Sequence, residues 1–237
     1  MHDLLIQTAA HVEATGARMA MQGKEPAYHN RLHTADTVVS MACLLRATRQ
    51  LSGRASKPLS KQDSLCLLTM LLHDYGHEGL INASKGCNEH QSVFLYTPVM
   101  QTMGLNPQDL AQVNAMVLNT DPASLNELHR LFKPQLSSAG QFGLEEMTIL
   151  VTEADVLASA LTYPGLQLTE SLILEWAEPY PEKSLFLSTS EGRLAFLDSG
   201  VHFSSNASKA LGIPQMVALQ KQLLRGKMTH HSLRTSH

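Results

Sequence analysis

The chain has 237 residues, of which 43% are hydrophobic, so it is long enough to bury one sizeable core. A formal net charge of −3 with 16% charged residues provides no basic field, so we expect no binding to duplex nucleic acid. No uncharged stretch has the length of a membrane helix, and the first residues lack the cationic start of a signal peptide. We therefore expect a cytoplasmic protein without a membrane partner.

Hydrophobic residues recur at helical spacing along most of the chain, and no stretch shows the alternation that is typical of a strand. The sequence predicts an all-α fold, with a first amphipathic helix over residues 3–21 and a second over 36–50. Ser60 and Asp63 have the spacing of a capping box, so a third helix should begin there and lead to residues 71–79.

Proline marks the helices of the second half of the chain. Asn106-Pro107 and Asp121-Pro122 are each typical of a helix start, and Pro134 should close the second of these helices. A linker is expected at residues 137–140, followed by a long helix over 144–161. Shorter helices are expected near 166–177, 191–199 and 214–225.

The composition gives no reason to divide the chain into two units. We predict a single catalytic domain over residues 1–226 and a disordered tail over 227–237, which has no apolar period. Cys43, Cys66 and Cys87 are odd in number and lack a CxxC pair, which favours reduced thiols.

Two imidazoles and a carboxylate lie within five positions in the segment 71–79, as His73, Asp74 and His77. Imidazole and carboxylate together suit divalent ions such as zinc, manganese or iron. A lone histidine is more often a core or surface residue held by hydrogen bonds. A second pair, His29 and His33, shifts the balance toward a metal site, because residues four apart share one face of a helix.

A further candidate ligand lies far along the chain, at Asp155. This aspartate interrupts the apolar run ILVTEADVLASAL over residues 149–161. An unpaired carboxylate is costly to bury, so Asp155 should face a cation or a polar partner. We favour a role as a metal ligand.

Three segments together carry a resemblance to a known family: YHNRLHTADTV from Tyr28, HDYGHEGLIN from His73, and VTEADVLASAL around Asp155. The pattern resembles the HD-superfamily metal-dependent phosphohydrolases, and most closely the catalytic domain of class I 3′,5′-cyclic nucleotide phosphodiesterases. It runs from about Tyr28 to about Phe203. The resemblance implies a compact multi-helix bundle of the HD-domain, PDEase-like type.

The resemblance also implies a dinuclear centre. It assigns His33, His73, Asp74 and Asp155 as ligands, with Asp74 bridging to a second ion that is held mostly by water. The two divalent ions could be Zn, Mn, Mg or Fe. Such a pair generates a hydroxide near neutral pH and neutralises phosphoryl oxygens.

The family's general acid matches His29, which would protonate the leaving oxygen. The alternative for His29 is to orient the ligands. By the same resemblance, His77 contacts the bridging water or the substrate phosphate, and Asn82 matches the Asn that follows the motif.

The resemblance is weaker in the substrate pocket. Trp176, Tyr180 and Phe196 match residues that enclose the base, although Trp176 and Phe196 could equally be core aromatics. Arg193 stands where the family has a base-binding Gln, and Ala158 replaces a base-contacting Asn.

Three further residues could support the site or serve the fold alone. Glu89 and His90 match an acidic residue and a histidine of the family's next helix. Asp121 matches an Asp near the centre, but it could equally act as the N-cap before Pro122.

Three functions remain open from the sequence. The first is a metal-dependent phosphodiesterase acting on a small nucleotide substrate. The second is an HD-fold mixed-valent di-iron oxygenase, which needs extra His ligands; His90 and His129 lie at poor spacing for that role. The third is a metal- or nucleotide-binding module without turnover.

Overall fold

The computed structural model describes residues 1–134 and 143–234, with side chains up to Gly226. Over these residues the chain forms twelve α-helices and no strand, which confirms the predicted all-α class. The first six are α1 (His2–Met21), α2 (Arg31–Leu51), α3 (Lys61–Leu72), α4 (Cys87–Thr102), α5 (Pro107–Leu118) and α6 (Pro122–Leu131). The rest are α7 (Leu144–Ala160), α8 (Thr162–Trp176), α9 (Pro181–Leu187), α10 (Ser190–Ser199), α11 (Asn206–Ala210) and α12 (Ile213–Arg234).

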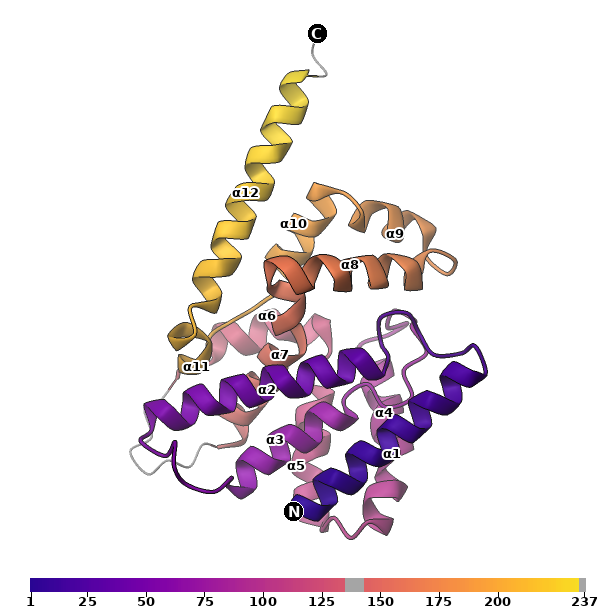
Figure 1. Cartoon of the computed structure of the whole chain (residues 1–237), viewed down its shortest axis with the longest axis vertical. Coiled ribbons are helices and arrows are strands. Elements are labelled where there is room, and N and C mark those ends of the chain that lie inside the picture. Colours follow the sequence, from indigo (N-terminus) through magenta and orange to yellow (C-terminus); the bar gives the residue numbers. More distant parts are fainter. Residues whose placement is uncertain (135–142, 235–237) are drawn as a thin grey trace.

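The core forms where α2, α3 and α7 pack together, with α1 and α5 against α3 (Figure 1). Met41 and Leu44 of α2, Leu68 of α3, and Leu150 and Val151 of α7 are all fully buried. Helix α7 is buried around most of its circumference, as expected for a helix that is apolar on nearly every side. The central position of α7 brings Asp155 between α2 and the end of α3.

Local sequence signals fix the helix ends that position the motif residues. Asn30 caps α2 by accepting hydrogen bonds from the backbone nitrogens of Leu32 and His33, so α2 begins at Arg31 rather than at residue 36. The predicted capping box of Ser60 and Asp63 opens α3. Both Asn-Pro and Asp-Pro starts are also confirmed, at α5 and α6.

Three features lie outside the predicted pattern. The short helices α9 and α11 were not predicted, and α12 continues past Gly226 to Arg234, into the segment where the sequence predicted a disordered tail. The predicted linker at residues 137–140 and the last three positions, 235–237, lie outside the described residues. None of the described helices is both long and apolar enough to cross a membrane.

Candidate metal centre

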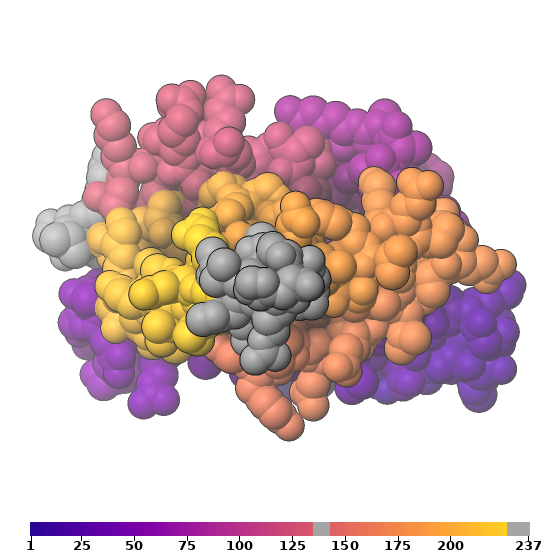
Figure 2. Space-filling model, turned by 90° about the horizontal axis from the view of Figure 1, so that it is seen from above, coloured from indigo at the N-terminus to yellow at the C-terminus, as the bar shows by residue number. Residues whose placement is uncertain are grey.

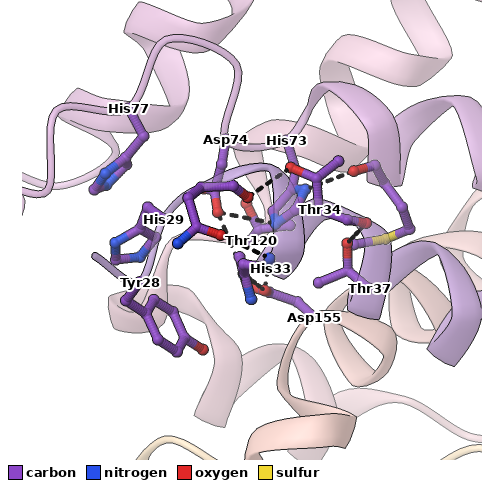
Figure 3. Close-up of polar contacts among 12 residues, drawn as sticks. Tyr28, His29, His33, Thr34, Thr37, His73, Asp74, His77, Thr120 and Asp155 are labelled. Carbon is purple, nitrogen blue, oxygen red and sulfur yellow. Dashed lines mark hydrogen bonds and ion pairs between the residues drawn. The ribbon is translucent and has the colours of Figure 1, made fainter. Parts of the chain in front are cut away.

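Four side chains predicted as metal ligands meet at one point of the fold (Figure 3). His33 lies in the first turn of α2, His73 and Asp74 follow α3, and Asp155 lies on α7. The Oδ2 atom of Asp74 is 3.4 Å from His33 Nε2 and 3.1 Å from His73 Nε2. The Oδ1 atom of Asp155 is 3.3 Å and 3.4 Å from the same two nitrogens. Residues up to 122 positions apart thus direct their donor atoms at a common centre.

The tautomer of His73 fits a metal ligand. Its Nδ1 atom lies 2.9 Å from the carbonyl oxygen of Met70, and a carbonyl can only accept, so Nδ1 carries the proton. In the neutral ring the lone pair is therefore on Nε2, which is buried and has no hydrogen-bond partner. Without an ion, burial alone would lower the pKa of His73, but the charges of Asp74 and Asp155 outweigh it and hold this pKa well above its usual value, so an ion would replace a proton on Nε2. A buried lone pair aimed at two carboxylates is unfavourable unless a positive charge lies between them. This arrangement fits a divalent ion with mixed nitrogen and oxygen ligands.

The pKa values of the cluster also favour a bound cation. Burial alone would lower the pKa of His33, but hydrogen bonds with Asp155 and Asp74 outweigh it and raise the pKa to about 9. Burial alone would raise the pKa of Asp155 and Asp74, but the neighbouring His73 and His33 hold both pKa values below their usual range. Two ionised carboxylates thus demand positive charge, which an ion can supply in place of protons.

A second group of donor atoms, from His29, His77 and Glu175, is also close enough to hold an ion. The geometry of this second group suits proton transfer better than it suits the binding of a metal ion. The His29 and His77 rings are stacked, with centroids 3.9 Å apart and planes 27° apart. An imidazole binds an ion in the plane of its ring, and two nearly parallel rings cannot both do so for one ion lying between them. Glu175 is already engaged, because its Oε2 atom accepts from the backbone nitrogens of Tyr28 and His29.

The second carboxylate oxygen of Glu175 fixes the ring of His29. Its Oε1 atom lies 2.5 Å from His29 Nδ1, which leaves Nε2 free of this contact. The fold brings α8 against the motif loop at Gly79, whose φ of +77° favours glycine. An added Cβ at Gly79 would lie 3.0 Å from Glu175 Cγ. The glycine therefore allows the carboxylate to approach the loop.

His77 is the second ring of the stack with His29 (Figure 3). Its Nδ1 atom accepts from the backbone nitrogen of Gly79, and its Nε2 atom lies 3.1 Å from Asn88 Nδ2. Burial and the neighbouring His29 lower the pKa of His77 to about 4. His77 is therefore neutral near pH 7.

A cavity of about 450 Å³ opens beside the cluster. Its polar wall contains His29, His33, Asp74, His77 and Asp155, continued by residues 82, 88, 89, 120 and 121. The lining also contains apolar residues: Leu80, Ile81, Pro122, Ala123, Leu125, Val156, Leu172, Trp176 and Phe196. A single ammonium group, from the exposed Lys183, is also part of the lining. A lining with both ionisable and apolar side chains suits a ligand that has one strongly polar part and one apolar part.

Asn82 links the polar wall together. Its Nδ2 atom donates to Glu89 Oε2 at 3.0 Å and to Asp121 Oδ1 at 3.4 Å, and its Oδ1 atom accepts from the backbone nitrogen of Asn88. Asp121 also caps α6 through the backbone nitrogen of Ala123. Glu89 and Asp121 thus combine a structural role with a place in the wall, whereas His90 is exposed and outside the cavity lining.

Two of the residues predicted to bind substrate lie elsewhere. Tyr180 packs edge-on against Trp176, and its hydroxyl accepts from the backbone nitrogen of Ile81, but it is not part of the cavity lining. Arg193 is buried at 5% exposure and donates to Ser159 O at 2.6 Å and Thr169 Oγ1 at 3.1 Å. Its guanidinium cross-links helices rather than facing the cavity.

The sequence reasoning missed Glu175 and Asn88. Glu175 follows the apolar run Leu172–Leu174 and precedes Trp176, so an acid within an apolar helical stretch was the available signal, as it was for Asp155. Asn88 carries no comparable signal, because an asparagine near a helix start is common. No family model matches the chain, and no curated protein is significantly similar to it.

Proposed function

We propose that the protein is a metal-dependent phosphodiesterase that hydrolyses a 3′,5′-cyclic nucleotide or a related nucleotide phosphodiester. The observation that carries the proposal is the meeting of four donor side chains beside a cavity that is lined by three of them, His33, Asp74 and Asp155, and by His29, which pairs with Glu175. The resemblance of the three sequence segments to class I cyclic nucleotide phosphodiesterases, and thus to an HD-domain bundle, supports the same function.

The ligand set suits two divalent ions of Zn, Mn, Mg or Fe, with His33, His73, Asp74 and Asp155 around one and Asp74 shared with the other. Ions bound there would supply a hydroxide near neutral pH and neutralise the phosphoryl oxygens. The ionised carboxylates and the buried His73 Nε2 atom are the features of the chain that favour such ions.

The side chains that would move a proton are His29 and Glu175. Hydrolysis forms a new P–O bond and breaks the P–O bond to the sugar, whose oxygen then needs a proton. Glu175 orients the His29 ring through Nδ1, so Nε2 is the atom that can donate this proton to the leaving oxygen. Burial alone would raise the pKa of Glu175, but the hydrogen bond with His29 outweighs it and lowers this pKa below its usual value. The carboxylate therefore stays charged.

The apolar residues of the cavity lining indicate how the base of the substrate would be held. Phe196 and Trp176 offer aromatic surface, while Arg193, at the position of the family's base-binding Gln, is turned into the fold. We expect the base to be bound by shape and stacking. Apolar contacts of this kind discriminate only roughly 10- to 200-fold, whereas hydrogen-bond readout reaches about 10⁴-fold.

The two alternatives have less support. A di-iron oxygenase needs further His ligands, but His90 is exposed, and both ring nitrogens of His129 are engaged by Ser204 and Thr152. A non-catalytic binding module would have the same donor cluster and cavity, so neither feature favours it over the enzyme. It differs from the enzyme in one measurable respect, which is the absence of turnover.

The test is hydrolysis by purified protein loaded with manganese or zinc. Cyclic mononucleotides, cyclic dinucleotides, nucleoside monophosphates and an aryl phosphodiester form the substrate panel. We expect turnover of at least one phosphodiester, its loss in Asp155→Asn, and no change in Asp198→Asn, a matched control at an exposed aspartate of α10. Stoichiometric metal without turnover of any phosphodiester would overturn the proposal.

A further inference from the structure

Helix α12 extends away from the body of the protein, and one side of it packs against none of the other described helices (Figure 1). Its first half packs on α10 and α11 through Ile213, Val217 and Gln220. Met216, Leu219 and Leu223 are spaced three and four apart, so they form a second stripe, and Leu219 and Leu223 are each 57% exposed. We call these three residues the α12 stripe.

A second exposed apolar stripe lies on α8. Tyr163, Leu166 and Leu174 are 74%, 55% and 69% exposed, and their positions place them on one face of the helix together with Glu170. We call Tyr163, Leu166 and Leu174 the α8 stripe. Figure 2 shows α12 and the α8–α10 segment on the same side of the molecule. Exposed apolar side chains that gather on one face of a helix are typical of protein contact surfaces.

The two stripes differ in the charge around them. Residues 199–237 contain five Lys or Arg residues and no Asp or Glu, so this segment carries net positive charge even though Lys221 and Arg225 pair with Asp198 of α10. Near the α8 stripe, by contrast, lie the exposed acids Glu170, Glu178 and Glu182. Among the ion pairs of residues 1–134 and 143–226, none involves these three acids.

We propose that the α12 stripe of one copy packs against the α8 stripe of a second copy, and that the second copy reciprocates in a two-fold dimer. Both surfaces are single helices with apolar residues at three- and four-residue spacing, which suits ridge-into-groove packing. The charges favour this pairing over the alternatives, because α12 against α12 would bring basic segments together and α8 against α8 would bring acids together. In a two-fold dimer each copy supplies both surfaces, which closes the assembly.

The test is the oligomeric state of the full chain and of two surface variants, measured by sedimentation over a concentration series. The unaltered chain should be a dimer. Leu219→Asp/Leu223→Asp and Leu166→Asp/Leu174→Asp should each sediment as monomers, with helical content and thermal midpoint near those of the unaltered chain. Ile6→Asp on α1 is the matched control, because Ile6 has the same 57% exposure as Leu219 and should leave the dimer intact.

Mixing the two surface variants makes the test specific for the α12–α8 pairing. One variant retains an intact α12 stripe and the other an intact α8 stripe, so the mixture should form a heterodimer that neither forms alone. A monomeric unaltered chain would overturn the proposal. A mixture that stays monomeric, a dimer broken by only one of the two variants, or a dimer broken equally by Ile6→Asp would overturn it as well.

Discussion

The Oε1 atom of Glu175 lies 2.5 Å from Nδ1 of His29, across 146 positions of the sequence. The other carboxylate oxygen accepts from the backbone nitrogens of Tyr28 and His29, at 2.7 Å and 2.9 Å. One side chain of α8 therefore fixes both the backbone entering α2 and the orientation of the His29 ring. This relationship assigns Glu175 a positioning role in the proposed proton transfer.

Replacing Glu175 by Gln should impair substrates with alkoxide leaving groups far more than an activated aryl diester. General acid catalysis contributes about 10²- to 10⁴-fold, and we expect much of this factor to be lost when the His29 ring loses its charged partner. Bound metal should stay near that of the unaltered protein. The measurement is kcat/KM for both substrate types together with metal stoichiometry, and Glu178→Gln on the surface is the control.

A double-mutant cycle sharpens this prediction. If Glu175 acts through His29, then His29→Ala/Glu175→Gln should be no slower than His29→Ala alone. Equal losses on both substrates, accompanied by a fall in bound metal, would instead mean that His29 and Glu175 only hold the ligands in place.

Asp74→Ala should abolish hydrolysis, whereas Asp121→Ala should mainly cost stability. Asp74 faces both His33 and His73, while Asp121 caps α6 and accepts from Asn82. Loss of the cap should lower the free energy of unfolding by about 1 kcal/mol. Metal analysis and chemical denaturation of both variants check this. Retained metal and turnover in Asp74→Ala, with metal lost in Asp121→Ala, would reverse the two roles.

Metal affinity should increase with pH between pH 6 and 8. Without an ion, the pKa of His33 is raised to about 9, so the imidazole is protonated over this range and must release a proton to bind metal. Each released proton changes the apparent affinity by about tenfold per pH unit. Competition with a chromophoric chelator measures the slope. A dissociation constant that is independent of pH would contradict the arrangement of charges described for the cluster.

Acid should destabilise the protein in part through His129, which is not part of the cavity lining. His129 is buried between Ser204 and Thr152, and burial together with the nearby His202 lowers its pKa to about 4. A pKa lowered by folding means that the neutral ring contributes stability above pH 6.5, which is lost as the pH falls toward 4. We expect a loss of about 1–3 kcal/mol from this residue. Denaturation at pH 7 and pH 4 should show a smaller loss in His129→Gln, and equal losses would contradict the prediction.

Base preference should be weak. Since Phe196 and Trp176 offer aromatic surface in the cavity lining and Arg193 is turned away, kcat/KM for the cyclic adenosine, guanosine, cytidine and uridine nucleotides should agree within roughly tenfold. Phe196→Ala should raise KM for all four by similar factors. A ratio of kcat/KM values of about 10⁴ in favour of one base would contradict this prediction, because it would require hydrogen bonds between the protein and that base.

The features predicted from the sequence are those encoded over short distances. The helix starts at Ser60, Asn106 and Asp121 follow from side chains that bond the next turn of backbone, and all three are present. The ligand candidates were predictable because imidazoles and carboxylates within apolar runs need partners. That His33 and His73 meet Asp155 follows from the packing of α2 and α3 on α7.

The features that were missed depend on packing between distant helices. Arg193 and Tyr180 occupy sequence positions that match a substrate pocket, but Ser159 and Ile81 engage them in other directions. The partnership of Glu175 with His29 requires α8 to lie against the motif loop, which no local pattern predicts. The continuation of α12 past Gly226 is also unpredicted, because glycine usually favours a helix end.

The most direct test of the metal centre is anomalous diffraction from crystals of the protein loaded with manganese. We predict a peak about 2.0–2.3 Å from His33 Nε2, His73 Nε2 and a carboxylate oxygen of each of Asp74 and Asp155. A second peak should share Asp74. No peak at these four residues under saturating manganese, or a peak only between His29, His77 and Glu175, would contradict the account.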